Sequence, residues 1–354
     1  MDRLKNTLDK IQALDDEWKR VAQRRLDRLT KPPGSLGRLE DIAKWYIQVT
    51  GKCPPRLPKK ILFTLAADHG VVEEGVSAYP KAVTAQMVHN FLKGGAAINV
   101  LARHVGTEIR VVDMGVDFDF KKIPGLVDKK IRRGTQNMTK GAAMSREDAR
   151  ASLTSGIEMA EEAARGGAGL IGTGEMGIGN TTASSAIVSV LTHAPVHRVC
   201  GRGTGIDDRR LAHKQKVIDA AIALNQPDPT DPIEVLAKVG GFEIGGLAGL
   251  MLGAAAHRIP IVLDGFIASA AALVAVGMKP ETKAYLLAAH QSAEPGHAIA
   301  LRHLGLSPLL AFNMRLGEGT GAALGITLVD AAIKIVNEMA TFASAGVSEK
   351  AERR

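Results

Sequence analysis

Glu318 is a candidate general base, because it stands alone between two glycines before a predicted long helix. The segment 313–322 reads NMRLGEGTGA. The flanking glycines allow a ligand to approach the backbone closely. Burial beside an apolar ligand would raise the pKa of a glutamate and suit it to accepting a proton. A glutamate at a helix start can also merely complement the helix dipole, and this segment alone leaves that alternative open.

Two glycine-rich segments have the composition of anion-binding turns. Segment 171–185 reads IGTGEMGIGNTTASS, and segment 201–208 reads GRGTGIDD. In both, glycines lead into a predicted helix start, where backbone N–H groups can face an anion. The first segment is neither a Walker A loop nor a dinucleotide fingerprint placed after the first strand. A turn with a purely structural role remains the alternative.

Lys214 follows the second glycine-rich turn, near the second turn of the predicted helix. An ammonium group beside such turns suits a phosphate. A lone lysine is more often exposed to solvent, so the sequence leaves both roles open for it.

Metal chemistry finds little support in the spacing of the possible ligands. His69, His290 and His297 could form a site with Asp68 and Asp113. However, no HExxH or comparable two-ligand spacing links them. We therefore expect neither a metal nor another cofactor.

Short apolar runs that alternate with helical segments must position these residues. The predicted strands are Ile61–Ala67, Ile109–Asp113, Gly169–Gly172, Ile261–Asp264 and Tyr285–Ala289. Helices are predicted near 84–104, 145–165, 180–192, 208–224, 243–257 and 266–277, with a final one from Thr320 to Phe342. This rhythm predicts an α/β fold: a mostly parallel, Rossmann-like sheet flanked by helices, whose strand order stays open.

Polar residues follow all five predicted strands. The endings begin at Asp68, Asp113, Thr173, Asp264 and His290. Ligands of open α/β sheets bind outside the carboxyl ends of the strands, so these endings predict one shared site. A single aspartate after a strand could instead cap a helix.

The two ends of the chain are predicted to form a small helical domain. Apolar spacing predicts an amphipathic helix over residues 3–29, then a break at KPPGSLG (31–37) and a second helix to Thr50. The expected division is residues 1–60 as the N-terminal helical segment and 61–310 as the catalytic α/β domain. Residues 311–354 would supply the C-terminal active-site loop and a helix that joins the small domain.

The net charge of +8 raises the possibility of a nucleic-acid partner. Residues 1–60 hold 15 Lys and Arg against 8 Asp and Glu, so nearly all of the excess lies outside the candidate site. We therefore expect no nucleic-acid partner. Two cysteines, the lack of a signal-peptide core and the lack of a membrane-spanning pattern lead us to expect a cytoplasmic protein without a membrane partner.

Five segments together resemble the nicotinate-nucleotide–dimethylbenzimidazole phosphoribosyltransferase family. They are KPPGSLGRLE (31–40), ADHGV (67–71), GTGEMGIGNTT (172–182), GRGTG (201–205) and RLGEGTG (315–321). The likeness runs in order from about residue 4 to about residue 343. It implies a cytoplasmic homodimer that transfers the 5-phosphoribosyl group of nicotinate mononucleotide to 5,6-dimethylbenzimidazole in cobalamin biosynthesis. The products are α-ribazole 5′-phosphate and nicotinate, with inversion at C1′.

The resemblance also implies roles for individual residues. Glu318 corresponds to the proposed general base, Glu175 to a second active-site carboxylate and Lys214 to a lysine on the phosphate side. The aromatic-base pocket corresponds to Ser77, Tyr79 and Gln86 in the segment VSAYPKAVTAQ (76–86). The glycine-rich turns and strand ends add further expected substrate contacts: Gly174, Gly177, Asn180, Thr181, Gly203, Asp264, Ser292 and Leu316.

Two other functions remain open at this point. The strand-end site could belong to a different enzyme that processes phosphoribosyl groups or nucleotides. The chain could also be a nucleotide-sensing regulator, with the basic face of its N-terminal helix as a surface for a partner.

Overall fold

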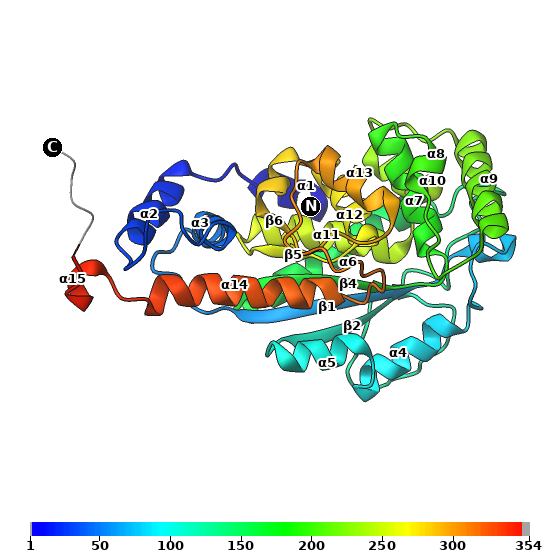
Figure 1. Ribbon diagram of the computed structural model, residues 1–354. Coiled ribbons are helices and arrows are strands. Elements are labelled where there is room, and N and C mark those ends of the chain that lie inside the picture. The colour runs from blue at the N-terminus through cyan, green and yellow to red at the C-terminus, as the bar shows by residue number, and fades with distance from the viewer. Residues whose placement is uncertain (1, 349–354) are drawn as a thin grey trace.

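A six-stranded, wholly parallel sheet forms the centre of the molecule (Figure 1). The computed structural model describes residues 2–348. The strands are β1 (Lys59–Ala67), β2 (Glu108–Gly115), β3 (Leu126–Asp128), β4 (Ala168–Met176), β5 (Ile261–Leu263) and β6 (Leu286–Ala288), in the order β3-β2-β1-β4-β5-β6. The predicted α/β class and parallel sheet are confirmed. In this doubly wound order the strands progress outward in both directions from β1 and β4, the point where such sheets bind ligands.

Helices cover both faces of the sheet (Figure 1). The ones that position the site are α3 (Arg38–Thr50), α4 (Val83–Lys93), α5 (Ala97–His104), α6 (Arg146–Arg165), α7 (Asn180–Thr192), α9 (Asp208–Asn225), α11 (Phe242–Ala256), α12 (Phe266–Met278), α13 (Pro295–Leu304) and α14 (Thr320–Glu338). One core lies between the sheet and α6, α7, α11 and α12. A second core lies between the opposite face and α3, α4, α5 and α14. Because both faces are covered, the central strands are buried along nearly their whole length.

Glycines let helices α6 and α11 touch backbone to backbone. A Cβ on Gly156 of α6 would lie 2.0 Å from the carbonyl oxygen of Gly246 of α11. A Cβ on Gly249 of α11 would lie 1.9 Å from the carbonyl oxygen of Leu153. These two glycines therefore serve helix packing rather than ligand binding.

Two predicted helices are each divided in the structure. Residues 3–29 form α1 (Arg3–Lys10) and α2 (Asp16–Asp27), because Asp15 caps α2 by accepting a hydrogen bond from the amide of Glu17. Residues 84–104 form α4 and α5, which separate at Gly94, where φ is +78°. The apolar spacing continues across both breaks, so periodicity alone predicted continuous helices.

Several short elements escaped the sequence-based prediction. They are β3, α8 (Val196–Val199), α10 (Pro232–Val239), α13 and α15 (Phe342–Ala345). The last long helix, α14, ends at Glu338 rather than at Phe342. Within residues 2–348, α14 is the one helix whose length and composition would suffice to cross a membrane, and 56% of its apolar window is buried in the protein. Such helices also form the cores of globular proteins, and α14 packs along the sheet.

The second and third helices of the chain meet the C-terminal segment near the end of α14, where α2, α3 and α15 gather (Figure 1). The amide of Thr30 donates a hydrogen bond to the carbonyl oxygen of Ala340, and the amide of Phe342 donates one to Arg28. In contrast, α1 packs against α6 and α11. The core under α2 and α3 continues to the sheet. The division at residues 60 and 310 stays a prediction, and residues 349–354 of its last range lie outside the described part.

Candidate active site

A pocket of about 480 Å³ lies at the carboxyl ends of β1, β4, β5 and β6. Segments that follow these strands line it, together with α4, the 201–205 turn and the loop before α14. Ten of the predicted site residues line the pocket: Ser77, Tyr79, Glu175, Gly177, Asn180, Thr181, Gly203, Ser292, Leu316 and Glu318. The structure therefore brings most of the predicted site together at the sheet edge where the polar strand endings converge.

The backbone of Glu318 adopts a conformation that non-glycine residues rarely take. Its φ is +64°, and its neighbours Gly317 and Gly319 have φ of +83° and +98°. Three successive left-handed residues make a sharp turn at the start of α14. The Thr64 hydroxyl donates a hydrogen bond to the Glu318 carbonyl oxygen (3.0 Å). A strained residue that is held in this way is typical of functional sites.

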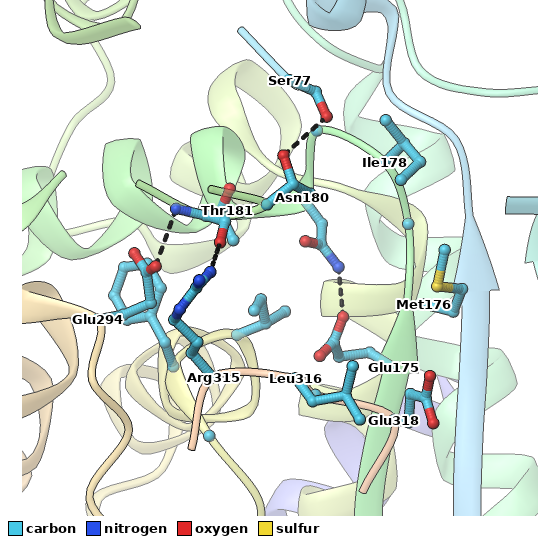
Figure 2. A pocket seen from close by; sticks show the side chains of 18 of the residues that line it. Ser77, Glu175, Met176, Ile178, Asn180, Thr181, Glu294, Arg315, Leu316 and Glu318 are labelled. Atoms are coloured by element: carbon cyan, nitrogen blue, oxygen red, sulfur yellow. Dashed lines mark hydrogen bonds between the residues drawn. The ribbon is translucent and has the colours of Figure 1, made fainter. Parts of the chain in front are cut away.

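The carboxyl group of Glu318 is buried in the pocket wall beside Leu316 and Met176 (Figure 2). Its Oε2 accepts a long hydrogen bond, 3.4 Å, from the amide of Ile98 in the first turn of α5. Burial, opposed by the Ile98 amide and aided by the charge of Asp264, raises the pKa of Glu318 to about 6. A carboxyl group with this pKa is ionised at neutral pH and able to take up a proton.

Glu175 lies at the end of β4 on the same side of the pocket as Glu318 (Figure 2). The side-chain amide of Asn180, the first residue of α7, donates a hydrogen bond to its Oε2. Burial, and then the nearby carboxylates of Asp264 and Glu243, hold the pKa of Glu175 well above its usual range. A cation bound beside it would favour its ionised form.

The 201–205 turn is clamped from two sides. Glu294, which precedes α13, accepts a hydrogen bond from the amide of Gly203 (2.9 Å). Arg315 donates one to the Gly203 carbonyl oxygen (2.8 Å) (Figure 2). Within residues 2–348, Arg315 is the one arginine or lysine that lines the pocket. Sequence reasoning did not assign Glu294 or Arg315, although Arg315 lies in the same glycine-rich segment as Glu318.

Lys214 of α9 is buried directly behind the pocket wall rather than exposed. Its Nζ donates hydrogen bonds to the Thr181 hydroxyl (2.8 Å) and to the Gly201 carbonyl oxygen (3.4 Å). Burial lowers the pKa of Lys214, while Cys200 and Glu294 act in the opposite direction. A Cβ on Gly203 would lie 3.3 Å from Nζ, so the turn packs against the ammonium group.

The 76–79 segment forms the other side of the pocket. The Thr204 hydroxyl lies 3.3 Å from the hydroxyl of Ser77 and accepts a hydrogen bond from the Ala78 amide (3.0 Å). Gln86 does not line the pocket: it lies on the exposed face of α4. The same helix presents Val83 and Met87 to the pocket instead. Val83 and Met87 lie one helical turn apart and both line the pocket, whereas the side chain of Gln86 is exposed.

Gly174 and Asp264 also stand behind the lining rather than in it. A Cβ on Gly174 would lie 2.4 Å from the Glu318 carbonyl oxygen, so this glycine allows the two backbones to touch. The carboxylate of Asp264 accepts hydrogen bonds from the amides of Gly319, Gly321 and Ala322. Asp264 therefore does cap a helix, although the helix is α14 and not the one that follows it in the chain.

The histidines at the strand ends have different hydrogen-bond and ion-pair partners, although the rings of His290 and His297 pack edge to face. His69 pairs with Glu243 (2.7 Å), and His290 lines the pocket near Asp264. His297 accepts a hydrogen bond from the Ser292 amide, and burial lowers the pKa of His297 to about 3. In the part of the chain that the structure describes, no three His, Cys, Asp or Glu side chains form a group that could hold a metal ion.

Comparison with known proteins agrees with this geometry. Residues 11–347 match the model of a family described as phosphoribosyltransferase. The chain is 57% identical over 349 residues to the nicotinate-nucleotide–dimethylbenzimidazole phosphoribosyltransferase of Geobacter sulfurreducens, covering 99% of both chains. It is also 57% identical to the protein of that name from Desulforudis audaxviator, again covering 99% of both chains.

A solved structure extends the likeness to three dimensions. The crystal structure of CobT from Thermus thermophilus superposes with a TM-score of 0.90 at 45% identity, covering 94% of this chain and 100% of that one. Family match, sequence identity and fold all span nearly the whole chain. The chain belongs to the phosphoribosyltransferase family of these relatives.

Proposed function

We propose that Glu318 is the general base in the reaction of this family, the transfer of a 5-phosphoribosyl group from nicotinate mononucleotide to 5,6-dimethylbenzimidazole. One observation carries the proposal: Glu318 places a buried carboxylate, with a pKa of about 6, in the wall of the main pocket. The pocket is large enough for a small-molecule substrate, and the apolar side chains of Leu316 and Met176 lie beside Glu318.

The chemistry needs a proton acceptor at the attacking base. One ring nitrogen of the benzimidazole attacks C1′ of the ribose, and the bond from C1′ to the nicotinate nitrogen breaks. The other ring nitrogen then loses its proton, which Glu318 accepts. Attack opposite the leaving group inverts C1′ and converts a β-linked substrate into an α-linked product.

Glu175 suits the other demand of this reaction. Nicotinate leaves from a positively charged pyridinium ring and becomes neutral at nitrogen, so it needs little acid assistance. Positive charge develops on the ribose instead, and an ionised Glu175 would stabilise it. The cationic substrate itself favours that ionised form, because an opposite charge lowers the pKa of a carboxyl group.

The phosphate of nicotinate mononucleotide fits the opposite part of the pocket. There the Gly203 turn, Thr181 and the buried ammonium of Lys214 lie together. Arg315 adds a guanidinium at the pocket surface. Binding energy from this remote group would hold the sugar in line for attack.

The test is a direct assay with a matched variant. Wild-type protein is mixed with both substrates, and nicotinate and α-ribazole 5′-phosphate are separated by chromatography. Glu318→Gln should lower kcat by about 10²–10⁴-fold, the usual contribution of a general base. Glu338→Gln, at the far end of α14, the helix that follows Glu318, should leave kcat unchanged. Near wild-type turnover by Glu318→Gln would refute the assignment.

The same assay separates the other possible functions. Turnover of a different nucleotide in place of this pair would support another nucleotide-processing enzyme. Binding of nicotinate mononucleotide without any turnover by the wild-type protein would instead support a sensor.

We also propose that the protein works as a cytoplasmic homodimer. Three large apolar side chains are exposed, Tyr79 and Leu316 at the pocket and Phe312 in the loop before α14, and a second subunit would cover such groups. Light scattering after size exclusion measures the mass in solution. A monomer at micromolar concentration would contradict the proposed dimer.

A further inference from the structure

Helix α14 begins without a capping side chain of its own. Its N-cap residue is Gly319, which has no side chain to accept a hydrogen bond. The preceding residues, Gly317 and Glu318, are also left-handed. Residues 318–323 are buried, so water does not satisfy the first amides of the helix. Something else must hold this turn in place.

Asp264 supplies the missing cap from a distant part of the chain. Its Oδ1 accepts hydrogen bonds from the amides of Gly321 (2.7 Å) and Ala322 (3.1 Å). Its Oδ2 accepts one from the amide of Gly319 (3.1 Å). Asp264 is only 2% exposed, and both of its oxygens are engaged. It directly follows β5, and its own amide donates to the Thr173 hydroxyl of β4 (3.0 Å).

We propose that Asp264 is a positioning residue for Glu318. Asp264 holds the left-handed turn that carries the Glu318 carboxylate, and Asp264 does not itself contact substrate. The proposal rests on the function proposed above for Glu318. It replaces the expectation that Asp264 is a substrate contact. Three amides on two oxygens leave little capacity for a ribose hydroxyl, and Asp264 does not line the pocket.

Asp264 also places a negative charge near Glu318, and this gives its role a measurable signature. Glu175 faces Glu318 from β4, His290 lies 3.9 Å from Asp264 after β6, and the Ile98 amide approaches from α5. The Asp264 charge raises the pKa of Glu318. Its removal lowers that pKa, so the base would stay ionised at lower pH.

The first experiment compares Asp264→Asn with wild type. The asparagine side chain keeps one acceptor oxygen but turns an NH₂ group toward backbone donors, so the turn loosens. We expect kcat to fall about 10²-fold, as for a misplaced catalytic group, with KM for nicotinate mononucleotide unchanged within about twofold. The acid limb of the kcat profile should also move to lower pH. A merely structural defect would not move this limb.

Thr64→Val is the matched control, because it removes another anchor of the same turn without changing any charge. The Thr64 hydroxyl bonds to the Glu318 carbonyl oxygen, and valine has nearly the same shape. We expect a smaller fall in kcat, about tenfold, and an acid limb at the wild-type pH. A shift of the limb in both variants, or in neither, would contradict the electrostatic part of the proposal.

A crystal structure of wild-type protein with nicotinate mononucleotide decides the question even if Asp264→Asn does not fold. Both Asp264 oxygens should remain on the three amides. An Asp264 oxygen within hydrogen-bond distance of the ribose or phosphate would overturn the proposal, as would a variant whose whole loss lies in KM. Failure of the proposed role of Glu318 gives a different result from failure of the proposed role of Asp264. In that case Glu318→Gln remains active although its Asp264 is intact.

Discussion

The amide of Glu318 donates a hydrogen bond to the carbonyl oxygen of Glu175, with 3.2 Å between the two atoms. The two carboxylates of the pocket are thus carried by backbones that are joined to each other. The negative charge of Glu318 disfavours ionisation of Glu175 and adds to the rise in its pKa. Of the two, Glu318 has the moderate pKa, about 6, that suits a base at neutral pH.

The pH dependence of kcat should follow the ionisation of Glu318. Only the ionised carboxylate accepts a proton, so kcat should be full above about pH 7 and fall as the pH drops through about 6. Measuring kcat at saturating concentrations of both substrates avoids the effect of pH on substrate binding. The residual rate of Glu318→Gln should not show this fall at acidic pH. A wild-type kcat that stays constant down to about pH 5 would contradict the prediction.

Glu318 should also make the stability of the fold depend on pH. Its pKa is raised above the unfolded value of 4.5, so its ionised form is disfavoured in the folded state. This penalty is absent below the unfolded value and complete once the pH has risen past about 6. Glu318→Gln should therefore match wild type at acidic pH and be more stable by about 1 kcal/mol at about pH 8. Denaturant unfolding at both pH values tests this, and a difference of the opposite sign would refute it.

Gly174→Ala should disable the site while the fold persists. The added Cβ would meet the Glu318 carbonyl oxygen at 2.4 Å and the Gly319 amide nitrogen at 2.8 Å, so the turn that carries Glu318 must move. We expect kcat to fall about 10²-fold. Gly172→Ala is the control on the same face of β4, because its Cβ would meet only side-chain atoms of Ile326 and Leu62, at 3.2 Å. Equal losses of kcat in the two variants would argue against a specific effect on the turn.

Lys214→Ala should weaken the binding of nicotinate mononucleotide more than it slows turnover. The substitution removes the ammonium behind Thr181 and the Gly203 turn, where we place the phosphate. We expect KM for nicotinate mononucleotide to rise by about tenfold or more, as for loss of a charged hydrogen bond. Lys216→Ala, an exposed neighbour on α9, should change nothing. An unchanged affinity in titration calorimetry would contradict the phosphate-side role.

The sequence by itself was sufficient for the α/β class, the parallel sheet and the polar strand endings that meet at one edge. Local signals sufficed because apolar runs, turn glycines and helix starts depend on neighbouring residues. Where the apolar periodicity continues across a break between two helices, as between α1 and α2, the prediction of one continuous helix was wrong. The strand order, with its reversal between β1 and β4, was beyond what periodicity could predict.

The roles of particular site residues were decided only by tertiary structure. Sequence spacing placed Asp264 and Gly174 among the substrate contacts, whereas the fold uses one to cap α14 and the other to admit the backbone of Glu318. Gln86 turns to solvent because the packing of α4 selects its other face. A sequence shows which groups are present, but their hydrogen-bond partners lie on strands and turns that come together only when the sheet is assembled.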